Sequence, residues 1–347
     1  MNKIIEEDVI KILQSNIEWS SFKNKTVLIT GANGFLPAYM VETLMYLNIH
    51  SNFDINVVCL VRNLVKAQNR FTHYLNNTHL LFLHQDVCDP INYDGEVDFI
   101  IHAASQASPK YYSTDPVGTM KANVIGTNNL LEFAKKKEVV SFLYFSSGEV
   151  YGEVSQDQLP IKETSFGYLD CNKIRSCYAE SKRMGENMCQ CYYVQYGVNT
   201  KVVRPTHTYG PKMDLNDSRV FADFVNNIVN NKNIELHSEG NAYRTFCYLS
   251  DATEAFFRIL LNKNGGQAYN MGNPSCEISI KNLASLLVDL YPMKKLKVVI
   301  NYPISTNCLA SNVLRSGVNI EKLISIGWFP SVSIQDGFRR TIDSYNE

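Results

Sequence analysis

The sequence predicts an α/β fold, a doubly wound parallel sheet with a smaller C-terminal α/β lobe. Short apolar, β-branched segments alternate with helical segments over about 180 residues, as in parallel sheets that helices cover on both faces. A glycine-containing turn joins the first strand to the first helix of this series. After residue 205 the alternation loosens, which indicates a second, smaller unit.

Each element follows from a local pattern. Apolar, β-branched runs predict buried strands at residues 25–30, 55–61, 97–104, 141–147 and 200–205. Helical spacing of apolar residues predicts helices at residues 4–14, 37–47, 116–137 and 177–196. In the second unit the same criteria predict helices at 219–231, 250–262, 279–290 and 335–345, with extended pieces at 244–249 and 297–300.

The composition excludes several classes of protein. The chain has 33 basic and 34 acidic residues and a net charge of −1, so no strong field attracts nucleic acid or an anionic membrane. Its nine cysteines form no paired C-x-x-C motifs, so we expect no metal site and reduced thiols. The N-terminus lacks a signal-peptide pattern, and no apolar run approaches the roughly 18 residues of a membrane span. We therefore expect a cytoplasmic protein.

The turn TGANGFLPAYM has the form of a loop that wraps a dinucleotide pyrophosphate. Gly31 permits the tight turn, and Gly34 lets the backbone approach the pyrophosphate at the helix N-terminus. Pro37 stands where a third glycine is usual. It is compatible with binding because backbone N–H groups in the first helical turn have no partner to lose. The predicted loop contacts to the cofactor are Gly31, Asn33, Gly34, Phe35 and Leu36.

Discrimination between NAD and NADP is left open by the second strand. That strand ends at Arg62, where enzymes that use NAD usually have an acid. The arginine could meet a 2′-phosphate, stack on adenine or point into solvent. Asp86 and Val87 stand where the adenine edge is expected, although Asp86 could equally be a turn residue. We assign Ala103 and Ala104 to the same cofactor site.

The stronger chemical signal is the segment YAESK. Tyr178 and Lys182 are four residues apart, so they share one helix face. The ammonium can lower the pKa of the phenol and make it a useful base near neutral pH. Ser147 ends an upstream strand and can hydrogen-bond the same substrate hydroxyl. A glycine loop, a strand-end serine and this pair, in that order, predict a dinucleotide-dependent catalytic site.

Three segments result from these assignments. Residues 1–23 are a helical extension, and residues 24–205 are a dinucleotide-binding Rossmann domain. Residues 206–347 are mainly the substrate lobe, with interleaving between the two left open.

Further stretches extend the pattern, among them HAASQASPKYYSTDP (102–116), SSGEVYGE (146–153), RSCYAESKRMGENMC (175–189) and RTFCYLSDA (244–252). From near residue 24 to its end, the chain resembles the extended short-chain dehydrogenase/reductases of the nucleotide-sugar epimerase and dehydratase group. Within that group it is most similar to UDP-glucuronate decarboxylases. The resemblance implies a tightly held NAD, a UDP-sugar substrate and a homodimer through helices 117–137 and 177–196.

The resemblance also implies residue roles. Tyr178 is the base on the sugar 4-hydroxyl, Lys182 holds the nicotinamide ribose, Ser147 polarises the same oxygen, and Glu149 lies beside the sugar ring. The implied substrate-binding residues are Ser108, Asn123, Arg175, His207, Asn216, Arg219, Arg244 and Arg315. Of these, Asn123 matches the asparagine that supports the active-site helix. His207 replaces a usual asparagine, and Arg315 stands near a segment that departs from the family pattern.

The expected function is oxidation of carbon 4 of a nucleotide sugar. Glu149 has no aspartate beside it, which is nearer the decarboxylase than the dehydratase pattern. The alternatives within this class are a 4,6-dehydratase, a 4-epimerase and a 4-dehydrogenase. A hypothesis from another class is a non-catalytic dinucleotide sensor, which predicts a damaged Tyr-Lys-Ser set. All three residues are present.

Overall fold

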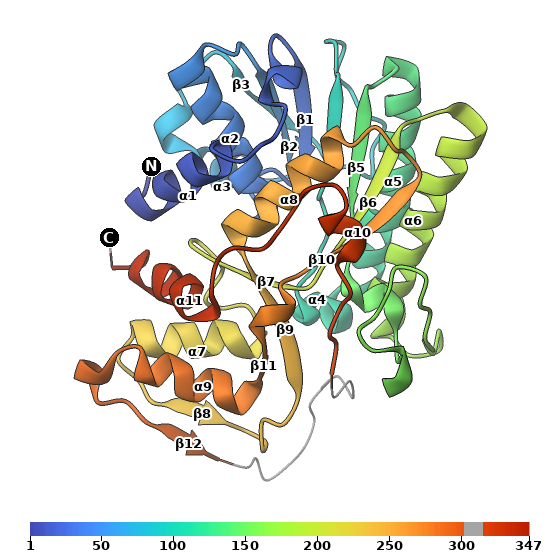
Figure 1. Ribbon diagram of the computed structural model, residues 1–347. Helices are drawn as coiled ribbons and strands as arrows, with labels where there is room; N and C mark the ends of the chain where they lie inside the picture. The colour runs from blue at the N-terminus through green and yellow to red at the C-terminus, as the bar shows by residue number, and fades with distance from the viewer. Residues whose placement is uncertain (302–314, 347) are drawn as a thin grey trace.

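The computed structural model describes residues 1–301 and 315–346. Its largest element is a sheet of seven parallel strands in the order β10-β6-β5-β4-β1-β2-β3 (Figure 1). These strands are β1 (Thr26–Thr30), β2 (Asn56–Val61), β3 (Leu80–His84), β4 (Phe99–His102), β5 (Ser141–Phe145), β6 (Thr200–Pro205) and β10 (Gln267–Met271). The arrangement confirms the predicted fold class.

Helices cover both faces of this sheet. Val27 and Ile29 of β1 pack into a core that includes side chains of α1, α2 and α8, whereas Leu28 packs into a core that includes side chains of α5 and α6. Successive residues of a buried strand point to opposite faces, so β1 must be apolar throughout. The helices are α1 (Lys3–Leu13), α2 (Phe35–Ser51), α5 (Pro116–Lys137), α6 (Ser176–Tyr196) and α8 (Leu249–Leu261).

A smaller lobe lies at the carboxyl ends of the parallel strands (Figure 1). It contains a three-stranded sheet in the order β11-β9-β7 and a β12-β8 pair. Its strands are β7 (His207–Tyr209), β8 (Ile234–Leu236), β9 (Tyr243–Tyr248), β11 (Glu277–Ser279) and β12 (Val298–Ile300). Its helices are α7 (Val220–Val229), α9 (Ile280–Asp289) and α11 (Ile334–Asp343). Between these elements the chain returns to the first sheet through α8 and β10, so the two lobes share the C-terminal half.

The N-terminal helix α1 is tied to both lobes through one buried carboxylate. Asp8 accepts hydrogen bonds from the hydroxyls of Tyr39 at 3.1 Å and Tyr248 at 2.7 Å. Arg340 of α11 donates to the same carboxylate at 2.9 Å. A buried charge is tolerated when it is paired and hydrogen-bonded in this way, so the extension is an integral part of the fold.

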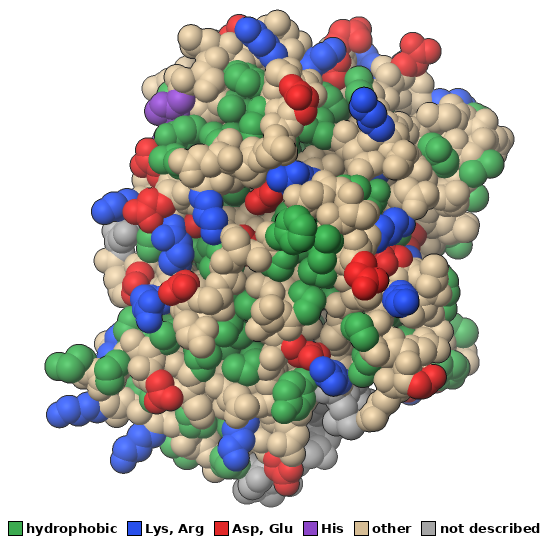
Figure 2. Space-filling model, in the orientation of Figure 1, with side chains coloured by type: hydrophobic (Ala, Val, Ile, Leu, Met, Phe, Trp, Pro, Cys, Tyr) green, Lys and Arg blue, Asp and Glu red, His purple; other side chains and the backbone are tan. Residues whose placement is uncertain are grey.

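Charged side chains of both signs are interspersed over the face in Figure 2, in keeping with the net charge of −1. Among the described residues, no helix is both long and apolar enough to cross a membrane. Three short helices, α3 (Leu64–Arg70), α4 (Pro109–Thr114) and α10 (Glu321–Ile324), lie in the connections between the longer elements.

Candidate active site

The glycine loop is shaped for close approach of a pyrophosphate. Gly31 has φ +62°, and a Cβ atom at this position would lie 2.9 Å from the Cα of Ala104. A Cβ on Gly34 would lie 2.9 Å from the carbonyl oxygen of Gly31. Gly34 is the N-cap of α2 and supplies no side-chain cap, which leaves backbone N–H groups at the helix N-terminus available to an anion. Pro37 is the third residue of α2 and interrupts nothing. These features fit a dinucleotide.

His102 positions the segment at Ala104 that borders the glycine loop. Thr127 donates its hydroxyl proton to the carbonyl oxygen of Asn123 at 2.6 Å, so the Nε2 of His102 must donate to Thr127, at 3.0 Å. The Nδ1 atom then accepts from the hydroxyl of Thr30 at 2.9 Å, and Thr30 accepts from the backbone N–H of Ala104 at 3.1 Å. Burial lowers the pKa of His102 to about 3. His102 is therefore a neutral bridge that positions the loop.

Arg62 and Asp86 lie together at the adenosine end of the predicted site. The Nη1 of Arg62 is 3.6 Å from the Oδ2 of Asp86, and 60% and 37% of the two side chains are exposed. Asp86 also accepts from the backbone N–H of Cys88 at 2.9 Å. Val87 beside it is buried. Because Arg62 is paired with Asp86, its charge is less available to a 2′-phosphate.

Tyr178 and Lys182 lie on one face of α6, one turn apart, and both are buried. The Nζ of Lys182 donates to the carbonyl oxygen of Phe145 at 2.6 Å and lies 5.8 Å from the centroid of the Tyr178 ring. Ser147 follows β5 by two residues and interacts with the phenol of Tyr178 through its hydroxyl. The structure thus brings Ser147, Tyr178 and Lys182 to one place at the carboxyl end of β5.

Burial disfavours the charged forms of both Tyr178 and Lys182. It raises the pKa of Tyr178 to about 12, against a smaller lowering by the hydrogen bond from Ser147. It lowers the pKa of Lys182 to about 7, against an opposing attraction from Glu186. A cation bound next to the phenol would stabilise its ionised form. The ligand-free site is therefore set for proton transfer only once a positive group is present.

The helix that carries Tyr178 is supported by a buried asparagine. Asn123 of α5 is fully buried and donates to the hydroxyl of Ser181 at 2.9 Å. Ser181 in turn donates to the carbonyl oxygen of Tyr178 at 2.9 Å. Asn123 therefore contributes to the site by supporting α6, because its own side chain is buried.

A buried ion pair supports the same helix one turn beyond Lys182. Glu186 accepts from the Nε of Arg204 at 2.9 Å and from its Nη2 at 2.6 Å, and 13% and 5% of these side chains are exposed. Ser146 also donates to Glu186. This bidentate pair joins α6 to β6 and places a negative charge near Lys182.

Glu149 lies in a short turn after Ser147 and pairs with Arg175, the residue before α6. The guanidinium donates to the two carboxylate oxygens at 3.0 and 3.2 Å. The ring of Tyr112 lies near both Tyr178 and Arg175. The centroids of the Tyr112 and Tyr178 rings are 4.8 Å apart, with an interplanar angle of 16°. The Cζ atom of Arg175 is 5.9 Å from the centroid of the Tyr112 ring. Tyr112 was not among the predicted site residues.

Two further arginines, both in the smaller lobe, influence this group through their charge. The positive charge of Arg219 opposes the raised pKa of the Tyr178 and Tyr112 phenols and lowers the pKa of His207. Its Cζ is 5.3 Å from the centroid of the Phe221 ring, which in turn is 5.9 Å from that of His207. The charge of Arg244 also lowers the pKa of His207. Burial lowers the pKa of Arg244 itself, and the charge of Glu149 opposes that lowering. Burial, then these two charges, lower the pKa of His207 to about 3, so its ring is neutral.

Arg219 and Arg244 differ in their own partners. Arg219 donates to the carboxylate of Asp217 at 3.0 and 2.7 Å. Arg244 donates to the carbonyl oxygen of Tyr243 at 2.7 Å, and no carboxylate of the described residues lies within ion-pair distance of it. Arg244 is therefore more available to an anionic ligand.

Three predicted substrate residues have other surroundings. Arg315 forms a bidentate pair with Glu277, at 2.6 to 3.1 Å, and 57% of its side chain is exposed. Asn216 is exposed, and its backbone N–H donates to Asp214. Ser108 is half-buried at the N-cap of α4 without a side-chain cap. Among the described residues, no hydrogen bond or ion pair joins these three to Tyr178 or Glu149.

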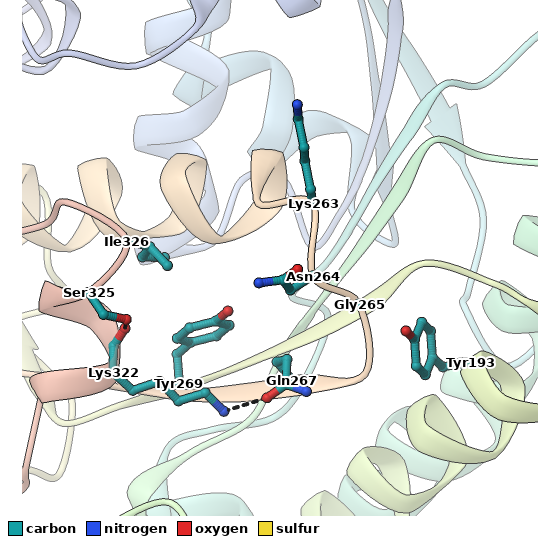
Figure 3. Close-up of a pocket in the computed structure, with 9 residues that line it drawn as sticks. All are labelled: Tyr193, Lys263, Asn264, Gly265, Gln267, Tyr269, Lys322, Ser325 and Ile326. Atoms are coloured by element: carbon teal, nitrogen blue, oxygen red, sulfur yellow. Dashed lines mark hydrogen bonds between the residues drawn. The ribbon is translucent and has the colours of Figure 1, made fainter.

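A cavity of ≈ 460 Å³ lies elsewhere, at the amino end of β10 (Figure 3). Strands β10 and β6 are parallel, with Gln267 opposite Lys201, so this end faces away from Tyr178. Lys322 donates to Gln267 at 2.8 Å across its floor, and Lys263 points away from it (Figure 3). The cavity contains none of the predicted site residues.

Residues 27–272 match the NAD dependent epimerase/dehydratase family. The chain belongs to this family. The match confirms the resemblance found in the sequence, the assignment as an enzyme of the extended short-chain dehydrogenase type, and NAD as the cofactor. A curated relative in this family, UDP-glucuronic acid decarboxylase 1 of Xenopus tropicalis, is 32% identical over 326 residues, covering 93% of this chain and 72% of the relative.

Solved structures share the fold of this family member. A UDP-glucose 4-epimerase of Thermotoga maritima with UDP-glucose has a TM-score of 0.79 at 23% identity, covering 92% of this chain and 98% of that one. A UDP-glucose 4-epimerase of Thermus thermophilus in complex with NAD has a TM-score of 0.75 at 24% identity, covering 92% and 99%.

Proposed function

We propose that this family member is a nucleotide-sugar enzyme that oxidises carbon 4 and decarboxylates UDP-glucuronate. The observation that carries the proposal is the pairing of Arg175 with Glu149 in the turn after Ser147, next to the helix that carries Tyr178, with the charges of Arg219 and Arg244 acting on the same group. UDP-glucuronate carries a diphosphate and a carboxylate, so its binding needs several cations in one cleft. The named decarboxylase relatives, about 30% identical, support the same assignment.

Tyr178, Ser147 and Lys182 act on the 4-hydroxyl. The Tyr178 phenolate accepts the hydroxyl proton, and the Ser147 hydroxyl holds the same oxygen. Lys182, fixed by its bond to the carbonyl of Phe145, stabilises the phenolate and binds the ribose of the cofactor. Bound NAD, held by the glycine loop and Lys182, would supply a reversible hydride acceptor for carbon 4. The phenol then returns its proton to the oxygen.

Oxidation at carbon 4 prepares the carboxylate on carbon 5 for loss. That carboxylate becomes β to a ketone, so its departure as CO₂ leaves an enolate that the 4-oxygen and its hydrogen-bond donors stabilise. Carbon 5 must then gain a proton. The proton comes from solvent, and we assign its relay to Glu149: the carboxylate takes up a proton from water and passes it to carbon 5, and Arg175 holds the side chain in place. Arg219, Arg244 and neutral His207 bind the diphosphate.

The residues that hold NAD are those of the glycine loop and the neighbouring strand ends. The α2 N-terminus meets the pyrophosphate, and Gly31 and Ala104 leave no room for added side chains. Asp86 favours the unmodified ribose, because its carboxylate would repel a 2′-phosphate. Tyr178 and Lys182 bind at the nicotinamide end. The assigned set otherwise consists of Asn33, Gly34, Phe35, Leu36, Arg62, Val87 and Ala103.

The 4,6-dehydratase, 4-epimerase and 4-dehydrogenase remain the alternatives within this chemistry. Each shares carbon-4 oxidation, and they differ only in the fate of the 4-keto intermediate. A sensor without catalysis is disfavoured because the Tyr-Lys-Ser set is complete, and Tyr178 and Lys182 are buried. The curated decarboxylase relatives, about 30% identical over most of the chain, favour the decarboxylase over these alternatives.

A homodimer through α5 and α6 is part of the proposal. These adjacent helices carry large apolar side chains exposed to solvent, which single chains seldom leave in such number. Val117, Met120 and Ile125 of α5 are 54, 40 and 42% exposed, and Val194 of α6 is 73% exposed. Light scattering measures the molar mass of the protein in solution, and the wild type should have the mass of a dimer. Substitution of Ile125 by Glu should give a monomer, whereas a wild-type monomer contradicts the proposal.

We assign the enzyme to the cytoplasm. The eight cysteines in the described part of the chain are free thiols, as in reducing compartments.

The experiment is a product analysis by mass. Purified protein is incubated in turn with UDP-glucuronate, UDP-glucose and dTDP-glucose. The proposal expects a UDP-pentose from the first and no change in the others. Water loss from dTDP-glucose supports the dehydratase instead, and isomerisation of UDP-glucose supports the epimerase.

A further inference from the structure

We infer that Tyr112 is a positioning residue that fixes the ring of Tyr178 and the Arg175–Glu149 pair in one geometry. The inference deepens the proposed function and rests on the base role given there to Tyr178. Tyr112 lies on α4, which is 64 residues or more upstream of Tyr178 in sequence, within the stretch 102–116 that resembles the family, but no role was predicted for it from the sequence.

The contact between the two tyrosines is direct and enclosed. Their rings are stacked at a centroid distance of 4.8 Å and an interplanar angle of 16°. The rings are 3% and 6% exposed, and with Cys177 they form a small cluster separate from the other cores. Tyr112 is therefore a direct aromatic neighbour of the Tyr178 ring. Aromatic pairs in this arrangement attract each other beyond the effect of burial alone.

Tyr112 is itself held in place. Its hydroxyl donates to the carbonyl oxygen of Ala107 at 3.0 Å, and α4 begins with Pro109, which fixes the backbone entering the helix. A swing of the side chain that carried the hydroxyl away from Ala107 would consequently break this hydrogen bond. A rigid plane against the Tyr178 ring restricts the phenol to one direction, as a proton acceptor for a single oxygen requires.

The same ring also meets the carboxylate side of the site. The guanidinium of Arg175 lies 5.9 Å from the Tyr112 centroid, within the range of cation–π attraction. Arg175 donates both hydrogen bonds to Glu149. Tyr112 thus touches the proposed base directly and the proposed carbon-5 acid through Arg175. One side chain couples two groups that act on neighbouring carbons.

The test compares ring-deleted and ring-retaining variants. Tyr112→Met and Tyr112→Leu remove the ring, Tyr112→Phe keeps it, and Tyr111→Met is the matched control on the same helix, where the side chain is 41% exposed. Each variant is checked for folding by circular dichroism and for bound NAD. Two quantities are then measured: kcat and KM with UDP-glucuronate, and the pH of ionisation of Tyr178 in the NAD-bound protein. Ionisation is monitored by tyrosinate absorbance, with Tyr178→Phe subtracted.

We expect the ring-deleted variants to lose about tenfold or more in kcat with KM changed by less than about threefold, because orientation and not affinity is lost. Without the ring, water reaches the phenol, so its ionisation moves to lower pH. Tyr112→Phe and Tyr111→Met should match the wild type in both readouts.

An unmoved Tyr178 ionisation in folded Tyr112→Met or Tyr112→Leu overturns the inference, even if CO₂ is released. Loss of folding in both ring-deleted variants also overturns it, because it assigns Tyr112 a purely structural role. A wild-type protein that leaves UDP-glucuronate unchanged contradicts the proposed function instead, and the ionisation readout still decides the position of Tyr112.

Discussion

Arg175 donates two hydrogen bonds, of 3.0 and 3.2 Å, to the carboxylate of Glu149. In sequence, Arg175 stands three residues before Tyr178. The pair spans the gap between the turn after β5 and the start of α6. Because one end of this bridge precedes the helix that carries the base, Glu149 and Tyr178 are held in a fixed relation. The bridge links the two groups that the proposed reaction uses at carbons 4 and 5.

Substitution of Glu149 by Gln should lower kcat for CO₂ release from UDP-glucuronate by about 100-fold, the usual loss when a proton-transfer group is removed. The amide keeps the size of the side chain and removes its proton-transfer ability. Initial rates measured by mass of the products check this. The control is Glu153→Gln, an exposed residue after the same turn, which should retain wild-type rates. Equal rates in the two variants would exclude a role for Glu149 in proton transfer.

Lys182 should make the NAD-free protein less stable at low pH. Burial lowers its pKa from 10.5 to about 7, so the unfolded chain binds the proton more readily than the folded one. The penalty is full below about pH 7 and is relieved as pH rises towards the unfolded value. Lys182→Met removes the titration, so its stability relative to the wild type should be greater at about pH 6 than at about pH 9.

Urea unfolding of both proteins at the two pH values measures this difference. Other titrating groups cancel because they are common to both chains. A relative stability that is constant with pH, or that grows as pH rises, contradicts the assignment of a depressed pKa to Lys182.

Asp86 should oppose NADP. Its carboxylate lies 3.6 Å from Arg62 on the surface. Asp86→Asn removes the negative charge and frees Arg62, so affinity for NADP should rise by about fivefold, the scale of an exposed ion pair. NAD affinity should change less. Fluorescence titration of cofactor-depleted protein checks both, with the exposed Asp89→Asn as control. NADP affinity that is the same in Asp86→Asn and Asp89→Asn would remove Asp86 from the cofactor site.

Arg204 should be needed for stability. Arg204→Met leaves Glu186 as a buried charge without its bidentate partner, and such a loss costs about 3–5 kcal/mol. The same substitution at Arg339, whose pair with Asp336 is exposed, should cost at most about 1 kcal/mol. Urea unfolding compares the two. Similar costs at the two positions would show that the buried pair contributes no more than a surface pair.

Local patterns were enough to predict the parts of the site that lie close together in sequence. The glycine loop follows β1 directly, and Tyr178 and Lys182 share a helix face by their spacing alone. The edge strands β3 and β10 were not predicted. The sequence of β10, QAYNM, lacks the continuous apolar run of a central strand, whereas that of β3, LLFLH, has such a run and could have been predicted.

Contacts between distant segments could not be read from the sequence. The stacking of Tyr112 on Tyr178 depends on how α4 packs against α6. Arg315 has the charge expected of a diphosphate ligand, but it pairs with Glu277 of β11, a partner that only the fold brings near. The choice of NAD likewise needed the family match, because Arg62 alone allowed either cofactor.

The most direct test traces the fate of the sugar carboxylate. UDP-glucuronate labelled in that carboxylate is incubated with the protein and with Tyr178→Phe, and labelled CO₂ is trapped. The account predicts labelled CO₂ from the wild type in proportion to UDP-pentose formed, and none above background from Tyr178→Phe. Label that stays in the sugar nucleotide in both reactions would contradict it.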